Sequence, residues 1–468
     1  PGDHLYLHSF PPRRSSDLQE KDFSGKWLGK LNVGATTLTV VINLTKNDNE
    51  KYSATLDSPD QLAYGIKVDT LDFDGLNLRL VSNIISAVYS AKYDATNSEF
   101  IGKFTQGGMP LDLNLKKVDK VEGPKRPQTP QPPFPYTELE VTFQNKKDAI
   151  TLAGTLTYPS EGKKIPAVVM ITGSGPQDRD ENIFGHKIFM VIADYLTRNG
   201  IAVLRFDDRG VGKSTGTFKG ATSFDFANDV SAAVEFLKTK EMIDKNNIGL
   251  IGHSEGGLIA PIVGTKRDDL AFLILLAGTG LRGDSILLLQ SELIARKSGE
   301  SESMIKKSND ANRKFYSLII SETDSIKLKS ETLKYLDGYK NTLTEGELKR
   351  IGDWDQFVKR ILDTILDEWF KTFVRTDPKD FLTKIKIPVL ALIGEHDLQV
   401  PPKENLEAIE KYLLEAGNNN FITLELKGLN HLFQECKTCT VAEYGQLEET
   451  FSPVALGIMS NWILQTVK

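Results

Sequence analysis

The spacing of hydrophobic residues changes along this chain, and each spacing predicts a different kind of structure. Within residues 19–120, apolar residues fall at every second position of several short segments, namely 38–44, 76–80 and 111–115. A period of two predicts strands with one buried face. Turn sequences separate these segments, namely Asn47-Asp48-Asn49, Asp74-Gly75 and Gly107-Gly108. We therefore expect a small antiparallel β domain over residues 19–120, either a barrel or a sandwich.

A proline-rich segment follows this region, and after it the pattern becomes mixed. The prolines that crowd the stretch from Pro124 to Pro135 predict an extended, semi-rigid linker over residues 121–135. From residue 136 to Gly278, short apolar runs alternate with helix-like segments. This alternation is typical of an α/β domain, with a mostly parallel sheet flanked by helices.

The segment from about residue 281 to 380 has a third pattern. Charged residues are dense there, and apolar residues recur at helical spacing, as at Phe357, Ile361 and Ile365. We interpret it as a helical insertion between two strands of an α/β domain that spans residues 136–468. Such an insertion would emerge at the carboxyl edge of the sheet and form a lid that excludes water. A purely structural insertion is the alternative.

Composition and charge narrow the classes of protein. A chain of 468 residues with 40% hydrophobic content can bury a large core. Its net charge of −6 gives no electrostatic reason to expect nucleic acid or an anionic membrane as a partner. No apolar stretch reaches the roughly 18 residues that would span a bilayer. Residues 1–18 resemble translated sequencing-adapter read-through, so a native signal peptide would have been lost upstream. This leaves the compartment open, a secreted or periplasmic one included.

One serine lies where a strand is expected to turn sharply into a helix. The apolar run Ile248–Ile251 leads directly into Gly252-His253-Ser254-Glu255-Gly256-Gly257. Glycines two residues before and after Ser254 leave room for the strand and the helix to approach each other. A serine hydroxyl is a weak nucleophile by itself, so the motif indicates catalysis only if a histidine base and an orienting acid are also present.

A base and an acid follow two later strands. His431 lies in a polar loop just after the alternating segment 421–426, and Asp397 follows the apolar run Ile387–Ile393. The carboxyl ends of parallel strands meet at one edge of a sheet, so Ser254, Asp397 and His431 can converge there. Glu395 is the competing acid. The other histidines are less suitable, because His4 and His8 lie in the tail, His186 opens a predicted helix, His253 belongs to the serine turn and His396 is expected to be a loop residue.

The intermediate of acyl transfer also needs two donors for its oxyanion. The backbone N–H of Glu255, directly after the serine, is the first candidate. The second is the N–H of Ser174, in the small-residue turn after the apolar run 167–172, with Gly175 as the alternative.

Two further motifs do not indicate a cofactor. The segment Gly212-Lys213-Ser214 fails as a phosphate-binding loop, because position 207 is aspartate where that motif needs glycine. Cys436 and Cys439 are the only cysteines, which excludes a four-cysteine zinc site within one chain. They form either a local disulfide or two free thiols, with a redox role as a weaker alternative. No metal and no organic cofactor is implied.

These motifs together resemble those of a known family. From about Tyr136 to Lys468 the chain resembles the α/β-hydrolase superfamily, and within it the EstD-type bacterial carboxylesterases and serine-aminopeptidase-like hydrolases. The resemblance lies in Gly173-Ser174-Gly175-Pro176-Gln177, Phe206-Asp207-Asp208-Arg209-Gly210, Gly252-His253-Ser254-Glu255-Gly256-Gly257, Gly394-Glu395-His396-Asp397 and Asn430-His431.

The resemblance implies the α/β-hydrolase fold and a carboxylesterase that cleaves small to medium acyl esters. Ser254, His431 and Asp397 would form its triad and an acyl-enzyme intermediate. A serine peptidase or aminopeptidase on the same triad is the alternative. The N-terminal β region resembles the accessory domains of some such enzymes, and a ligand-binding role for it is a further hypothesis. A non-catalytic scaffold has no need for all three triad residues.

Overall fold

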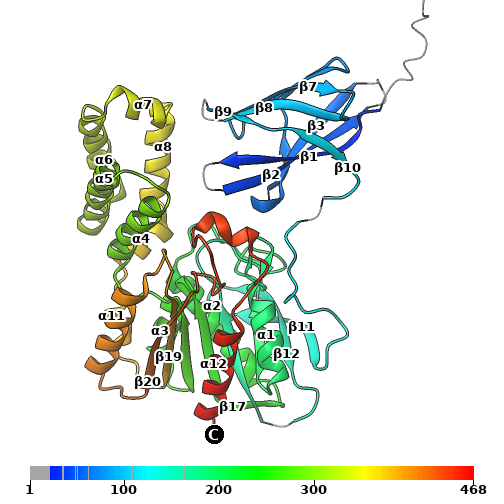
Figure 1. Cartoon of the computed structure of the whole chain (residues 1–468). Helices are drawn as coiled ribbons and strands as arrows, with labels where there is room; N and C mark the ends of the chain where they lie inside the picture. Colours follow the sequence, from blue (N-terminus) through cyan, green and yellow to red (C-terminus); the bar gives the residue numbers. More distant parts are fainter. Residues whose placement is uncertain are drawn as a thin grey trace, which may run out of the picture. The chain divides into compact units, whose positions relative to one another are not determined.

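The computed structural model describes residues 22–33, 36–47, 49, 51–61, 63–106, 109–121, 123–162 and 164–468 (Figure 1). The tail expected at residues 1–18, which contains His4 and His8, lies outside the described residues, as do Asp48 and the turn Gly107-Gly108. The chain divides into two compact units, Pro1–Gly123 and Pro124–Lys468.

The first unit is an antiparallel sheet of ten strands, in the order β4-β3-β2-β1-β10-β8-β7-β6-β5, with β9 paired to β8. The strands are β1 (Gly25–Val33), β2 (Thr36–Lys46), β3 (Tyr52–Ser58), β4 (Ala63–Lys67), β5 (Thr70–Phe73), β6 (Asn77–Ser82), β7 (Ala87–Asp94), β8 (Glu99–Gln106), β9 (Met109–Asp112) and β10 (Leu115–Val118). Aromatic side chains fill its core, where the rings of Trp27 and Phe100 lie 4.6 Å apart. The predicted N-terminal antiparallel β domain is confirmed.

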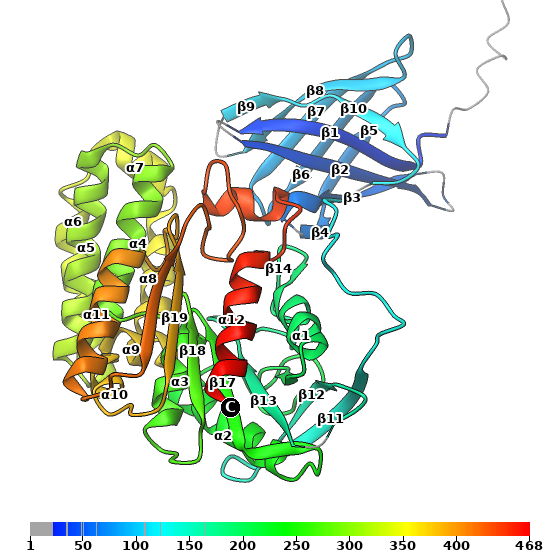
Figure 2. The same cartoon turned by 60° about the horizontal axis from the view of Figure 1, so that its bottom comes forward.

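The second unit contains an eight-stranded sheet in the order β11-β12-β16-β13-β17-β18-β19-β20 (Figure 2). Pairing is parallel from β16 to β20, whereas β11 and β12 are antiparallel. The strands are β11 (Thr137–Asn145), β12 (Ile150–Tyr158), β13 (Ile165–Ile171), β16 (Ala202–Phe206), β17 (Ile243–His253), β18 (Phe272–Leu276), β19 (Val389–Gly394) and β20 (Phe421–Leu426). The predicted α/β fold with a mostly parallel sheet is confirmed.

Helices cover both faces of this sheet, which is why strands such as β13, β18 and β19 are apolar on both faces. On one face α1 (Ile188–Arg198) and α12 (Pro453–Thr466) contribute to a shared core. On the other face α2 (Ser223–Lys238), α3 (Glu255–Gly264) and α11 (Pro402–Glu415) do the same. A small two-stranded sheet, β14 (Asn182–Ile183) with β15 (His186–Lys187), precedes α1.

The predicted helical insertion lies between β18 and β19. It contains α4 (Gly283–Lys297), α5 (Glu302–Ser321), α6 (Ser325–Lys340), α7 (Glu345–Ile351), α8 (Trp354–Ile365) and α9 (Glu368–Arg375), and α10 (Lys379–Leu382) leads back to the sheet. The helices share a hydrophobic cluster of their own, which includes Phe315, Ile319 and Val374. The two ends of the insertion touch, because a Cβ on Gly283 would lie 1.8 Å from the Phe373 carbonyl oxygen. Only glycine fits there.

The proline-rich segment contacts the rest of the second unit at defined points. The Arg126 guanidinium donates hydrogen bonds to the carbonyl oxygens of Phe184, Gly445 and Leu447. Gln128 accepts from the Thr450 N–H and donates to the Phe451 carbonyl.

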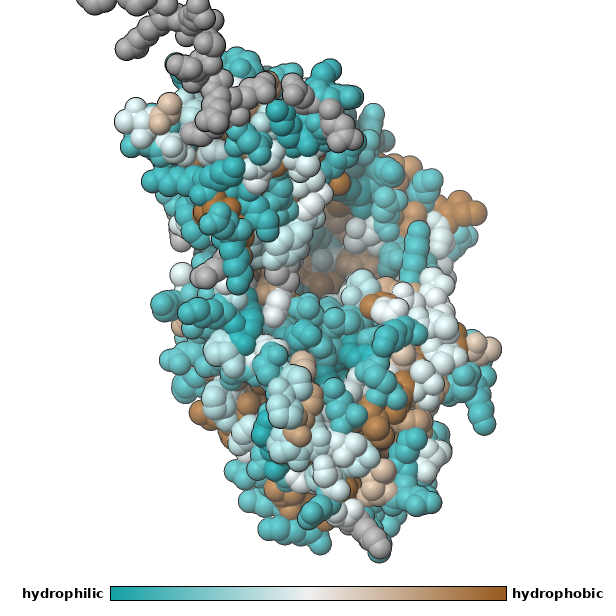
Figure 3. All heavy atoms as spheres, turned by 90° about the vertical axis from the view of Figure 1, so that its right-hand side faces the viewer, coloured by the Kyte–Doolittle hydropathy of each residue, from teal (hydrophilic) through white to brown (hydrophobic). Residues whose placement is uncertain are grey.

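On the face drawn in Figure 3, hydrophilic side chains cover most of the area and hydrophobic ones are scattered among them. Within the described ranges, no helix combines the length and the apolar character needed to cross a membrane. The same ranges hold no cluster of His, Cys, Asp and Glu side chains suited to a metal ion.

Candidate active site

Ser254 occupies a strained turn between β17 and α3. Its backbone has φ 55° and ψ −115°, in a region that non-glycine residues rarely adopt. The flanking glycines are required sterically, because a Cβ on Gly252 would lie 2.0 Å from the Gly256 carbonyl oxygen. A hydrogen bond of 2.8 Å from the Ser254 N–H to the Leu276 carbonyl ties the turn to the end of β18. The serine is therefore held at the carboxyl edge of the sheet.

Asp397 and His431 are joined at the same edge. His431 Nδ1 lies 2.7 Å from Asp397 Oδ2, and both residues are buried. The other oxygen, Oδ1, accepts from the N–H groups of Gln399 and Val400, which fixes the carboxylate. With Nδ1–H donating to the carboxylate, Nε2 is the basic nitrogen of the ring. Among the hydrogen bonds of the described chain, none joins the Ser254 hydroxyl to this ring.

The competing acid is occupied by other groups. Glu395 accepts from the Gly428 N–H and from Lys427 Nζ, and the backbone hydrogen bond from Gly428 is the main cause of its lowered pKa. Its contact to a histidine, at 3.9 Å, is with His396, whose side chain is about half exposed. Glu395 therefore supports the loop after β20, and Asp397 is the residue beside His431.

The two backbone donors expected for an oxyanion have no competing acceptor. Within the described residues, neither the Ser174 N–H nor the Glu255 N–H donates to a protein group. Glu255 is the first residue of α3, where helix N–H groups have no partner within the helix. The preceding N–H, that of Gly173, donates instead to Glu181 Oε1 at 2.7 Å.

The side chain of Glu255 connects the serine turn with the helical insertion. Its Oε1 accepts from Ser223 Oγ at 2.6 Å and from Trp369 Nε1 at 2.8 Å. Burial raises the pKa of this carboxyl. Helical spacing along residues 357–369 aligns Trp369 with an apolar stripe, and nothing in that pattern indicates that its N–H reaches a residue 114 positions away.

The loop Phe206-Asp207-Asp208-Arg209-Gly210 binds neighbouring chain segments through the carboxyl groups of Asp207 and Asp208. Asp207 binds the Arg179 guanidinium and accepts from the Lys213 N–H, so the segment Gly212-Lys213-Ser214 wraps around a carboxylate and not a phosphate. Asp208 accepts from Thr172 Oγ1 and from the Gln177 N–H, at the two ends of the turn that contains Ser174.

His186 is a buried packing residue that lies just before α1. Its ring nitrogens lie 3.0 Å from Thr450 Oγ1 and 2.9 Å from the Tyr444 carbonyl oxygen. Burial lowers its pKa to about 4.

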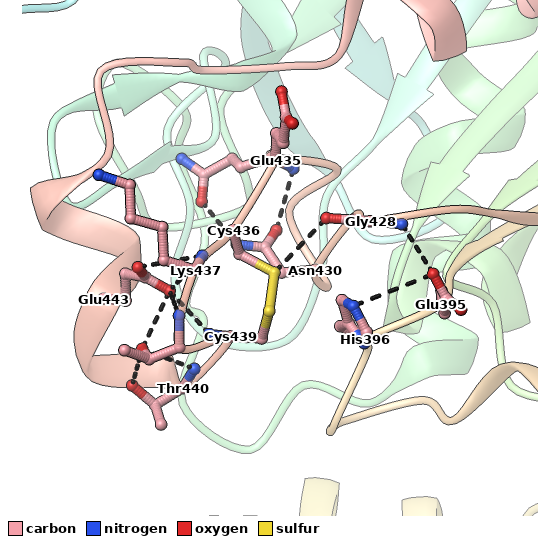
Figure 4. Close-up of a disulfide and its surroundings, with 12 residues drawn as sticks. Glu395, His396, Gly428, Asn430, Glu435, Cys436, Lys437, Cys439, Thr440 and Glu443 are labelled. Atoms are coloured by element: carbon pink, nitrogen blue, oxygen red, sulfur yellow. Dashed lines mark hydrogen bonds and ion pairs between the residues drawn. A yellow bond between two sulfur atoms is a disulfide. The ribbon is translucent and has the colours of Figure 1, made fainter.

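Cys436 and Cys439 form a disulfide in the loop that follows His431 (Figure 4). The Glu443 carboxylate lies beside it and accepts from the N–H groups of Lys437, Thr438 and Cys439. The Cys436 N–H donates to the Gly428 carbonyl. Of the two alternatives for these cysteines, the disulfide is the one present.

The fold of the second unit has a counterpart among known families. Residues 186–316 match the family model described as serine aminopeptidase, S33. The second unit thus has the α/β-hydrolase fold and is similar over these residues to that family.

The chain is also similar to proteins named as esterases. It is 26% identical over 350 residues to the esterase EstD of Thermotoga maritima, covering 74% of this chain and 73% of the relative. Similar solved structures include the esterase Pf2001 of Pyrococcus furiosus, with 17% identity, a TM-score of 0.43, and coverage of 75% of this chain and 100% of that one. Another is Est1E of Butyrivibrio proteoclasticus bound to ferulic acid, with 20% identity, a TM-score of 0.40, and coverage of 70% and 99%.

Proposed function

We propose that this protein is a serine carboxylesterase that cleaves small to medium acyl esters. Ser254 is the nucleophile, His431 is the general base and Asp397 orients the imidazole. The observation that carries the proposal is the buried 2.7 Å contact between His431 Nδ1 and Asp397 Oδ2, at the sheet edge where the strained Ser254 lies. A carboxylate in this position leaves Nε2 free to accept a proton and stabilises the imidazolium that results.

The reaction proceeds in two acyl transfers. Ser254 Oγ attacks the ester carbonyl while His431 Nε2 takes its proton, and the negative oxygen is bound by the N–H groups of Glu255 and Ser174. The tetrahedral intermediate then collapses, and the imidazolium gives its proton to the departing alkoxide, which leaves as the alcohol. Water repeats the sequence on the acyl-enzyme and releases the carboxylic acid.

We propose esters as the substrates because the relative EstD is named an esterase. Peptide hydrolysis is the second candidate, because the matching family model is described as a serine aminopeptidase. An amide differs from an ester in its leaving group, which must be protonated before it departs. Comparison of nitrophenyl esters with aminoacyl anilides separates the two functions.

Replacement of the nucleophile tests the proposal. We expect Ser254→Ala to fold normally and to lose at least about 1000-fold in kcat on a nitrophenyl acyl ester, because loss of the nucleophile removes the covalent pathway. Ser174→Ala is the matched control, since it removes a hydroxyl beside the site and keeps the backbone N–H. It should retain most of the activity. Turnover by Ser254→Ala at the wild-type rate would exclude Ser254 as the nucleophile.

A further inference from the structure

Two buried side chains beside the site have no role in the mechanism above. Glu181 is fully buried and His253 is 2% exposed. His253 Nδ1 lies 3.0 Å from Glu181 Oε1. Ordinary packing does not account for the pair, because Glu181 Oε2 is buried without a hydrogen-bond partner and Glu181 has a positive φ of 46°. Both features are destabilising, so the position needs another explanation.

Each member of the pair reaches a different part of the proposed machinery. Glu181 Oε1 also accepts from the Gly173 N–H at 2.7 Å, directly before the proposed donor Ser174. His253 Nε2 lies 3.1 Å from the carbonyl oxygen of His431, the proposed base. His253 itself precedes Ser254. The pair therefore links the loops that follow β13, β17 and β20, and these loops carry the second oxyanion donor, the nucleophile and the base.

The hydrogen bonds require one proton shared by the pair. A carbonyl oxygen only accepts, so His253 Nε2 carries a hydrogen toward His431. The contact between Nδ1 and Oε1 then needs a second hydrogen, which resides either on the ring or on the carboxyl. Although burial disfavours a charged ring, the Glu181 carboxylate raises the pKa of His253. An acid at position 181 satisfies every contact while the pair stays neutral as a whole.

We propose that Glu181 and His253 are positioning residues, which hold the Ser174 N–H and the backbone of His431 in register with Ser254. The proposal rests on the function proposed above. Alignment of this kind matters for rate, because a displacement of about 1 Å at a reacting centre can cost about 100-fold. The link acts on the transition state and not on substrate affinity, so its loss should lower kcat and leave KM nearly unchanged.

The isosteric variant Glu181→Gln is the main test. In this variant, a neutral His253 ring and the amide at position 181 cannot satisfy the contacts to Gly173 and His431 together. One of the two loops therefore loses its hydrogen bond. We expect kcat on a nitrophenyl ester to fall about tenfold or more with KM within about twofold of wild type, and Glu181→Ala to lose about 100-fold. Both are measured per active site, with Ser254 titrated by a fluorophosphonate, so that misfolded protein is not counted.

The matched control is Asn418→Ala. Asn418 is equally buried and donates to the carbonyl oxygens of Ile385 and Ile387, before the amino end of β19 and away from the proposed site. It should lower thermal stability without changing kcat per titrated site. Wild-type kcat per site in Glu181→Gln would overturn the proposal, and this variant decides the question if Glu181→Ala does not fold. Full activity of Ser254→Ala would instead overturn the proposed function itself.

Discussion

Asp208 and its neighbour Asp207 are both buried, but their pKa values shift in opposite directions. Burial raises the pKa of this residue to about 8. Its neighbour Asp207 behaves differently, because the hydrogen bonds from Arg179 and Lys213 outweigh the effect of burial and lower the pKa. Asp208 accepts hydrogen bonds from both ends of the turn that contains Ser174, and the nearby carboxyls of Glu181 and Glu255 raise its pKa further. The folded protein therefore holds this carboxyl in its neutral form at neutral pH.

This predicts a specific dependence of stability on pH. Because the folded pKa lies above the ordinary value of 3.8, the stabilising contribution is fully present below about pH 4 and is lost as pH rises to about 8. Asp208 alone should lower the free energy of unfolding by about 1.4 kcal/mol per pH unit within that window.

Urea unfolding of wild type and Asp208→Asn between pH 4 and 8 measures this contribution. For each protein, the free energy of unfolding is plotted against pH. The difference between the two slopes gives the contribution of Asp208 without that of the other titrating groups. Asp207→Asn, which removes a carboxyl with a lowered pKa, is the control and should leave the slope in this window unchanged. Identical slopes for wild type and Asp208→Asn would contradict the prediction.

At the scale of elements, strand ends were predictable and contacts between distant elements were not. Ser254, Asp397 and His431 each follow a run of apolar or alternating residues, and the structure has them after β17, β19 and β20. The partners of Glu181 and Trp369 lie 72 and 114 residues away in the chain. Such pairs depend on how loops and helices meet in space, which hydrophobic periodicity does not encode. Sequence spacing therefore indicated the candidate triad, but it did not indicate the contacts that Glu181 and Trp369 make beside it.

The contact of α9 with the serine turn leads to a prediction about the insertion. Trp369→Phe keeps the ring but removes the donor to the buried Glu255 carboxyl, so α9 should open more readily by about 1–2 kcal/mol. Hydrogen exchange of the backbone amides in residues 368–375 should then become faster. Trp354→Phe in α8 is the control, because its indole N–H donates to no group of the described chain. Equal exchange in both variants would contradict a role for this contact in holding the helix.

At the scale of the whole molecule, each unit has its own core. The aromatic cluster around Trp27 and Phe100 belongs to the first unit, and the two clusters that enclose the parallel sheet belong to the second. The candidate site is built entirely from residues after Pro124. The period of the hydrophobic residues changes at the proline-rich segment, and this change is the basis of the sequence prediction of separate domains.

We therefore expect residues 124–468 to fold alone and to hydrolyse a small nitrophenyl ester with kcat within about threefold of the full chain, since independent cores fold as separate units. The same fragment with Ser254→Ala is the control for background hydrolysis. Loss of activity from a folded fragment would assign the N-terminal unit a part in catalysis. Retained activity on small esters, with loss on larger or polymeric ones, would support the hypothesis that this unit binds ligands.

The close contact between Gly283 and Phe373 has a consequence for how such an enzyme can diversify. The insertion leaves and rejoins the sheet at nearly the same point. It can therefore be exchanged as one block without moving the strands on either side. Helices from another hydrolase could replace residues 283–375 without any change in the spacing of the strands that carry the chemistry. Selectivity among substrates of the proposed reaction could then change by exchange of this block, as long as the new helices supply a donor to Glu255 in place of Trp369.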